Sequence, residues 1–174
     1  MIIFFKYTHD RIQKGVKLET SLLADRRDQM TKDGTVISNF DQLVMDEAYD
    51  ILFRRLFFEA HAEIISGIPS HFVAETPTDI TAMRVDNFES ADYNTDRDFN
   101  LWLKVSDDFV RQTKKAIDIM IEQYIIDYIC WRWFETKLPQ DAVNYYNRLE
   151  NTLNKIKLQL NRRIKPIRRV MSFP

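Results

Sequence analysis

Apolar residues recur at helical spacing along most of the chain, and the pattern is clearest between residues 106 and 164. In the second half of this stretch the apolar positions alternate steps of four and three residues: Ala142, Tyr146, Leu149, Leu153, Ile156 and Leu160. This spacing is typical of a helix that packs along another helix. We therefore predict a long antiparallel helical hairpin made of residues 106–137 and 139–164.

The polar residues near the ends of this hairpin indicate where its helices begin. Ser106 is the predicted N-cap of the first arm, and the acids Asp107 and Asp108 suit the positive end of a helix dipole. Pro139 suits the first position of the second arm, where its missing N–H costs nothing. At roughly 1.5 Å per residue the arms are about 48 Å and about 39 Å long, which exceeds a typical globular helix.

Two further helices are predicted upstream of the hairpin. One runs over residues 42–66, from an N-cap at Asp41 to the stop signal of Gly67 and Pro69. Its apolar residues cover more than one side, so we expect it to be buried on more than one side, in part by another subunit. Residues 9–30 carry a weaker pattern that fits one helix or two short ones.

Strand-like runs are short. Residues 1–8 are rich in β-branched and aromatic side chains, which is typical of a short strand or an extended arm. The acidic insertion, residues 69–105, breaks the helical pattern and holds two β-like runs, 80–85 and 99–105, that we expect to form a hairpin. The predicted fold class is therefore mainly α: a helical bundle in a single domain, residues 1–174, with minor β structure in the middle segment.

Charge is distributed unevenly, although the formal net charge is only −1. Residues 151–174 hold seven of the 25 Lys and Arg residues and none of the 26 Asp and Glu residues, so residues 1–150 carry about −8. The single cysteine, Cys130, excludes an intrachain disulfide and fits a reducing compartment. The most apolar stretch, residues 116–134, is interrupted by four charged residues, so we expect no membrane span.

Motifs of catalysis, metal binding and nucleotide binding are missing from the sequence, and no cofactor is expected. Glycine-rich phosphate loops and a G-x-S-x-G elbow are absent. The His61-Ala62-Glu63 run matches half of the zinc-deaminase signature, but the cysteine pair that completes it is lacking. Cys130 has apolar neighbours that raise the pKa of a thiol. We therefore expect His61 and Cys130 to be ordinary residues of buried helices, and the chain not to be an enzyme.

Basic residues near the end of the sequence form the one constellation that stands out. The cations are Lys155, Lys157, Arg162, Arg163, Lys165, Arg168 and Arg169, the last three of which fall in a basic extended tail, residues 165–174. Three interpretations stay open: cations favoured at a helix C-terminus, contacts with nucleic-acid phosphates, and docking on an acidic surface of a neighbouring subunit. The acidic surface that an identical chain offers is Asp86, Glu89, Asp92, Asp96 and Asp98. A head-to-tail contact of this kind can close into a ring.

Several stretches resemble one group of proteins. They are residues 16–20, 41–65, 124–134, 142–146 and 162–169, the last of which reads Arg-Arg-Ile-Lys-Pro-Ile-Arg-Arg. These helical patterns resemble small virion proteins of Bacteroides-infecting, crAss-like phages and prophages. Proteins of this kind look like head-to-tail adaptor or neck-ring subunits.

The resemblance implies a structural subunit that forms a homo-oligomeric ring, commonly twelvefold, between the portal and the tail of a phage. It implies portal and other neck and tail proteins as partners, with DNA passing through the ring. It also places the protein in the virion, and in the host cytoplasm during assembly. From the residues alone, two alternatives remain: a nucleic-acid-binding helical protein that acts through the basic tail, and a helical enzyme whose site no motif reveals.

Overall fold

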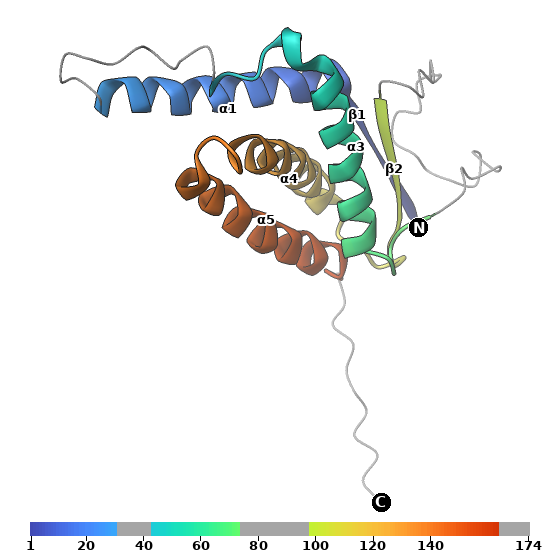
Figure 1. Cartoon of the computed structure of the whole chain (residues 1–174). Helices are drawn as coiled ribbons and strands as arrows, with labels where there is room; N and C mark the ends of the chain where they lie inside the picture. The colour runs from blue at the N-terminus through green and yellow to red at the C-terminus, as the bar shows by residue number, and fades with distance from the viewer. Residues whose placement is uncertain (31–42, 74–97, 164–174) are drawn as a thin grey trace, which may run out of the picture.

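The computed structural model describes residues 1–30, 43–73 and 98–163, and the fold is mainly helical, as predicted. In chain order the elements are β1 (Ile2–Thr8), α1 (His9–Met30), the 3₁₀ turn η1 (Glu47–Tyr49), α3 (Asp50–Gly67), β2 (Asp98–Lys104), the 3₁₀ turn η2 (Arg111–Thr113), α4 (Lys114–Phe134) and α5 (Pro139–Leu160). Figure 1 shows α1 above the α4–α5 hairpin, α3 crossing beside them, and the two strands next to each other on the far side of α3.

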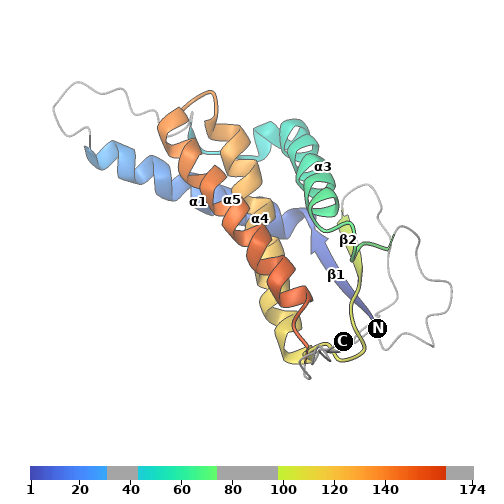
Figure 2. The same cartoon turned by 90° about the horizontal axis from the view of Figure 1, so that it is seen from below.

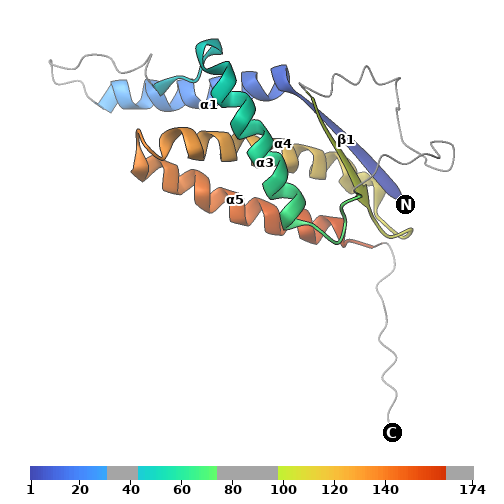
Figure 3. The same cartoon turned by 45° about the vertical axis from the view of Figure 1, so that its right-hand side comes forward.

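Helix α4 is the centre of the fold. It packs against α1, α3, α5 and β1, and Figure 3 shows it between α1 and α5, with α3 crossing over it. Its fully buried residues cover more than one side of the helix: Ile117, Ile121, Ile125, Ile129, Cys130 and Phe134. The chain itself therefore covers most of the apolar surface of α4, with Ile119 left 56% exposed.

The predicted hairpin is confirmed, with a small change in its seam. Pro139 is the first residue of α5, and the helix ends at Leu160, four residues before the predicted end. The buried positions of α5 are Ala142, Tyr145, Leu149, Ile156 and Leu160. Tyr146, predicted for the seam, is 52% exposed. Tyr145 takes its place because its ring stacks on Phe134 of α4, with 5.8 Å between the ring centroids.

The first arm of the hairpin begins later than predicted. Ser106 caps no helix, because α4 starts at Lys114, after the η2 turn. The backbone N–H of Val105 instead donates to the carbonyl of Met1 over 2.9 Å, and Phe109 is buried in the core. These tertiary contacts hold the segment after β2 in a non-helical path despite its favourable capping residues.

The helix predicted over residues 42–66 also starts later, since α3 begins at Asp50. The backbone just before it makes contacts with other helices. The carbonyl of Leu43 accepts a 2.7 Å hydrogen bond from Trp133, and the N–H of Met45 donates to Thr20 Oγ1 over 3.2 Å. Asp46 caps the η1 turn instead of lying inside a helix. The predicted cap Asp41 lies outside the described residues.

The strands join two distant parts of the chain. β1 pairs antiparallel with β2 from Ile2 opposite Lys104 to Thr8 opposite Asp98. The β-like runs at residues 1–8 and 99–105 are thus confirmed as strands, but β2 pairs with β1, and the predicted partner, residues 80–85, lies outside the described residues. On the helical side, residues 9–30 form one continuous 22-residue helix.

Candidate functional site

The start of α4 and the end of α5 lie together at one end of the hairpin. An isolated antiparallel bridge between the backbones of Phe109 and Arg163 fixes this contact, and Figure 2 shows the two helix ends side by side. Residues about 50 positions apart in the chain therefore share one surface. We call this surface the basic end.

The basic end gathers cations from two elements. They are Arg111, Lys114 and Lys115 from η2 and α4, and Lys157, Arg162 and Arg163 from α5 and the residues after it. Four of the six are exposed, and Lys114 and Lys157 are half-buried. Within residues 1–30, 43–73 and 98–163, no carboxylate forms an ion pair with any of these six side chains. A surface of this charge is suited to an anionic partner.

The cations at the start of α4 lie where a helix disfavours them. The first turn of α4 holds no acid, and its N-cap, Thr113, makes no side-chain capping hydrogen bond. Peptide dipoles give this end of a helix a partial positive charge, so Lys114 and Lys115 add to it instead of offsetting it. Positive charge that costs helix stability is typical of a surface retained for binding.

The structure places the sequence-predicted basic residues in two groups. Arg162 and Arg163 lie at the basic end and are exposed, whereas Lys165, Arg168 and Arg169 lie outside the described residues. Sequence reasoning missed Arg111, Lys114 and Lys115, because they were assigned to the interior of a helix that started at residue 106. The adjacent lysines Lys114 and Lys115, three residues after Arg111, were the signal that pointed to them.

The predicted acidic surface is mostly outside the described part of the chain. Asp86, Glu89, Asp92 and Asp96 lie there, and Asp98 is the first residue of β2, where its backbone pairs with Thr8. Docking of a basic tail on this surface stays a prediction.

Two titratable residues singled out by sequence, His61 and Cys130, lie on α3 and α4 and do not belong to the basic end. Cys130 is fully buried, and this burial raises the pKa of its thiol. His61 packs on the ring of Phe99, with 3.5 Å between centroids, and burial lowers the pKa of its imidazole to about 4. No three His, Cys, Asp or Glu side chains of the described segments are grouped so that they would hold a metal ion. Cys130 therefore lies in the core, and His61 lies half-buried against Phe99.

Asp127 is the one carboxylate buried within the described helices, 1% exposed. Its Oδ1 accepts a 3.0 Å hydrogen bond from Gln123 and lies 3.5 Å from Arg148. Burial raises the pKa of Asp127 to about 6, and the nearby Glu19 adds to this effect, while Gln123 and Arg148 oppose it. The charge is thus only partly compensated, which makes Asp127 a source of pH-dependent stability.

Among the described residues, no helix is both long enough and apolar enough to span a membrane. Compared with known proteins, the chain matches no family model, no curated protein and no solved structure.

Proposed function

We propose that the chain is a non-catalytic structural subunit that assembles with copies of itself. In keeping with its resemblance to small phage virion proteins, the assembly would be a ring between portal and tail, in contact with other virion proteins and with the DNA that passes through it. The observation that carries the proposal is the outer face of α3. Ile51 and Phe58, seven residues apart and so on one side of the helix, are 88% and 48% exposed.

Burial of such side chains against a partner is a strong driving force for association. Covering an exposed Ile or Phe side chain contributes about 1.5–3 kcal/mol. The same face carries Arg55, whose guanidinium is held by Glu59 over 2.9 Å, so the face combines an apolar stripe with a compensated charge. This composition is typical of an interface between protein subunits.

Native mass spectrometry over a range of protein concentrations tests the proposal. We expect a closed oligomer, twelvefold by the resemblance, that Ile51→Glu/Phe58→Glu converts to smaller species. Ile119→Glu is the matched control, since Ile119 is 56% exposed on α4 and lies outside this face. A wild-type chain that stays monomeric at every concentration would contradict the proposal.

The basic end favours a second candidate function, the binding of nucleic acid. Its six cations lack ion-pair partners among the described residues, and each phosphate contact that such a cation makes releases counterions. The logarithm of the affinity for duplex DNA would then fall steeply with the logarithm of the salt concentration. Fluorescence anisotropy with a labelled duplex measures this slope.

Matched pairs of variants sharpen this measurement. Arg111→Gln/Lys115→Gln and Arg162→Gln/Arg163→Gln should each weaken DNA binding and reduce the salt slope by roughly 1 for each lost phosphate contact. Lys14→Gln/Lys17→Gln removes two exposed cations of α1 and should leave the slope unchanged. Equal effects of all three pairs would show that DNA binding depends on the net charge of the chain and not on the basic end.

A further inference from the structure

A groove between α3, α4 and α5 combines aromatic rings with acidic side chains. Its volume is about 380 Å³. The lining residues are Glu63 of α3, Tyr124, Tyr128 and Trp131 of α4, and Tyr146, Leu149, Glu150 and Leu153 of α5. Four of the eight are aromatic, two are acidic, and none is basic. We call it the aromatic groove.

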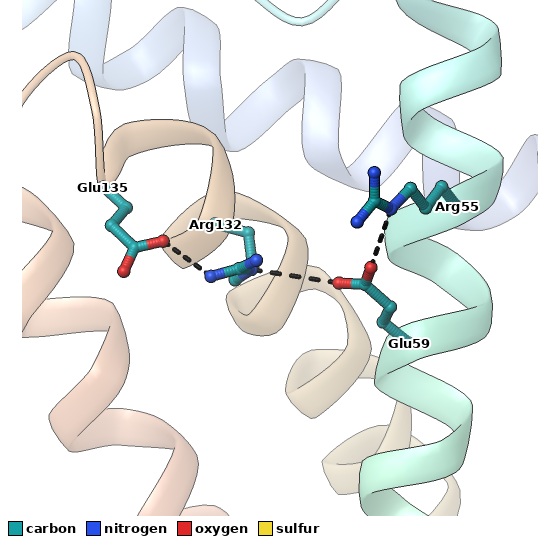
Figure 4. A network of polar contacts seen from close by, with 4 residues as sticks. All are labelled: Arg55, Glu59, Arg132 and Glu135. Atoms are coloured by element: carbon teal, nitrogen blue, oxygen red, sulfur yellow. Dashed lines mark hydrogen bonds and ion pairs between the residues drawn. The ribbon is translucent and has the colours of Figure 1, made fainter.

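The acids of the groove differ from the acids beside it. Figure 4 shows Glu59, one turn before Glu63, between two arginines: Arg55 at 2.9 Å and Arg132 at 3.8 Å. Glu63 and Glu150, by contrast, are exposed and form no ion pair with a described residue. The negative charge of the groove is therefore available to a ligand, whereas the charge of Glu59 is already compensated.

Two tyrosines that line the groove, Tyr124 and Tyr128, have pKa values above the ordinary value. Burial, and then the carboxylate of Glu63, raises the pKa of Tyr124 to about 12. Burial, Glu59 and Glu63 also raise the pKa of Tyr128. Negative potential over aromatic faces is the environment that attracts a Lys ammonium or an Arg guanidinium, through the ring quadrupoles and the carboxylates together.

We propose that the aromatic groove binds the basic segment 164–174 of a second copy of this chain. The proposal rests on the proposed self-assembly and names one of its contacts. The segment carries Lys165, Arg168 and Arg169 among the apolar residues Ile164, Ile167, Val170, Met171 and Phe173. Its cations match the acids of the groove, and its apolar side chains match the rings. Pro166 and Pro174 favour an extended backbone, which suits a long narrow site.

A second copy fits better than the same chain because of the direction in which α5 leaves the groove. The α5 residues that line the groove lie between Tyr146 and Leu153, and the helix continues beyond them to Leu160. A segment that follows Arg163 would therefore have to reverse its direction to enter its own groove. A segment from a neighbouring copy has no such restriction.

Disulfide trapping between two variants of the full-length chain tests the proposal. One copy carries Tyr146→Cys in the groove, and the other carries Phe173→Cys in the basic segment. Cys130 is fully buried and does not compete. We expect a cross-linked dimer when the two variants are mixed under mild oxidation. Glu63→Gln/Glu150→Gln in the Tyr146→Cys copy should reduce its yield at least tenfold.

The control removes two acids elsewhere. Asp86→Asn/Glu89→Gln changes the net charge by the same amount and should leave the yield unchanged. A loss of cross-linking confined to this control would assign the basic segment to the acidic insertion and overturn the groove as its site. A dilute chain carrying both Tyr146→Cys and Phe173→Cys that cross-links to itself would also overturn the proposal, since it would identify the same chain as the occupant.

Native mass spectrometry of the same samples separates this proposal from the assembly on which it rests. Oligomers that form normally but show no effect of Glu63→Gln/Glu150→Gln on the cross-link would overturn the groove contact alone. A monomer at every concentration, with no cross-link, would overturn both.

Discussion

The indole Nε1 of Trp133 donates a 2.7 Å hydrogen bond to the backbone carbonyl of Leu43, across 90 residues of sequence. This bond lies in the core, where Trp133 is 4% exposed and Leu43 is 7% exposed. It fastens the segment before α3 to the end of α4. The same ring is covered by Lys137, whose Nζ lies 3.2 Å from the ring centroid.

Trp133→Phe should therefore destabilise the fold by about 1–3 kcal/mol, because the carbonyl of Leu43 stays buried and loses its donor. The measurement is equilibrium unfolding in urea. Trp131→Phe is the matched control, since Trp131 lines the open aromatic groove and its indole makes no hydrogen bond with the described residues. Equal losses for both variants would show that indole volume, and not the hydrogen bond, determines the effect.

The cations at the two sides of the basic end should have opposite effects on stability. Arg111→Gln/Lys115→Gln removes cations from the positive end of α4 and should raise the free energy of unfolding by a few tenths to about 1 kcal/mol. Arg162→Gln/Arg163→Gln removes cations from the negative end of α5 and should lower it by a similar amount. Helix propensity contributes little, since Gln, Lys and Arg are similar. Thermal unfolding at low salt shows the difference best. A large loss from the α4 pair would mean that its cations are structural.

The raised pKa of Asp127 should make the stability of the fold depend on pH. Its folded-state pKa is about 6, above the ordinary 3.8, so between these values the folded chain binds more protons than the unfolded chain. Stability then falls as the pH rises through this window, by up to about 3 kcal/mol for the full shift. Asp127→Asn keeps the shape, can still accept the hydrogen bond from Gln123, and removes the charge.

We expect Asp127→Asn to match the wild type at pH 4 and to exceed its stability by about 1–3 kcal/mol at pH 7. The difference between the two urea-unfolding curves, measured from pH 4 to pH 7.5, cancels the titration of the other carboxylates. A variant that is less stable than the wild type at pH 7 would show that the ion pair with Arg148 outweighs burial.

The sequence predicts those parts of the fold that depend on local signals. The α4–α5 hairpin follows from regular spacing and from Pro139, both readable within one segment. Ser106 shows the limit of such reading, because its capping signal is sound but Val105 and Phe109 are held by distant residues. Residues 43–46 are likewise held in a non-helical conformation by hydrogen bonds to Thr20 and Trp133.

The candidate sites show the same division. Arg162 and Arg163 stand out by sequence because they are clustered, while Arg111 and Lys115 join them only through the folding of α4 onto α5. The aromatic groove draws on three helices, from Glu63 to Leu153, so no single segment reveals it. Long-range pairing, such as that of β1 with β2, likewise depends on which partner the whole fold brings near.

Gly15 and Ile126 provide a test of how tightly α1 packs on α4. A Cβ at Gly15 would lie 2.5 Å from Cδ1 of Ile126 and 3.2 Å from its Cγ1, and Ile126 is buried, so its side chain has little free space to move into. Gly15→Ala should gain about 1 kcal/mol in helix propensity but lose about 1–3 kcal/mol to overpacking, so we expect a net destabilisation.

Ile126→Val removes the clashing Cδ1. In that background Gly15→Ala should become stabilising by up to about 1 kcal/mol, because the propensity gain remains and the main clash is gone. Urea unfolding of the four proteins of this double-mutant cycle measures the change of sign. Additive effects would show that α1 moves away from α4 at little cost.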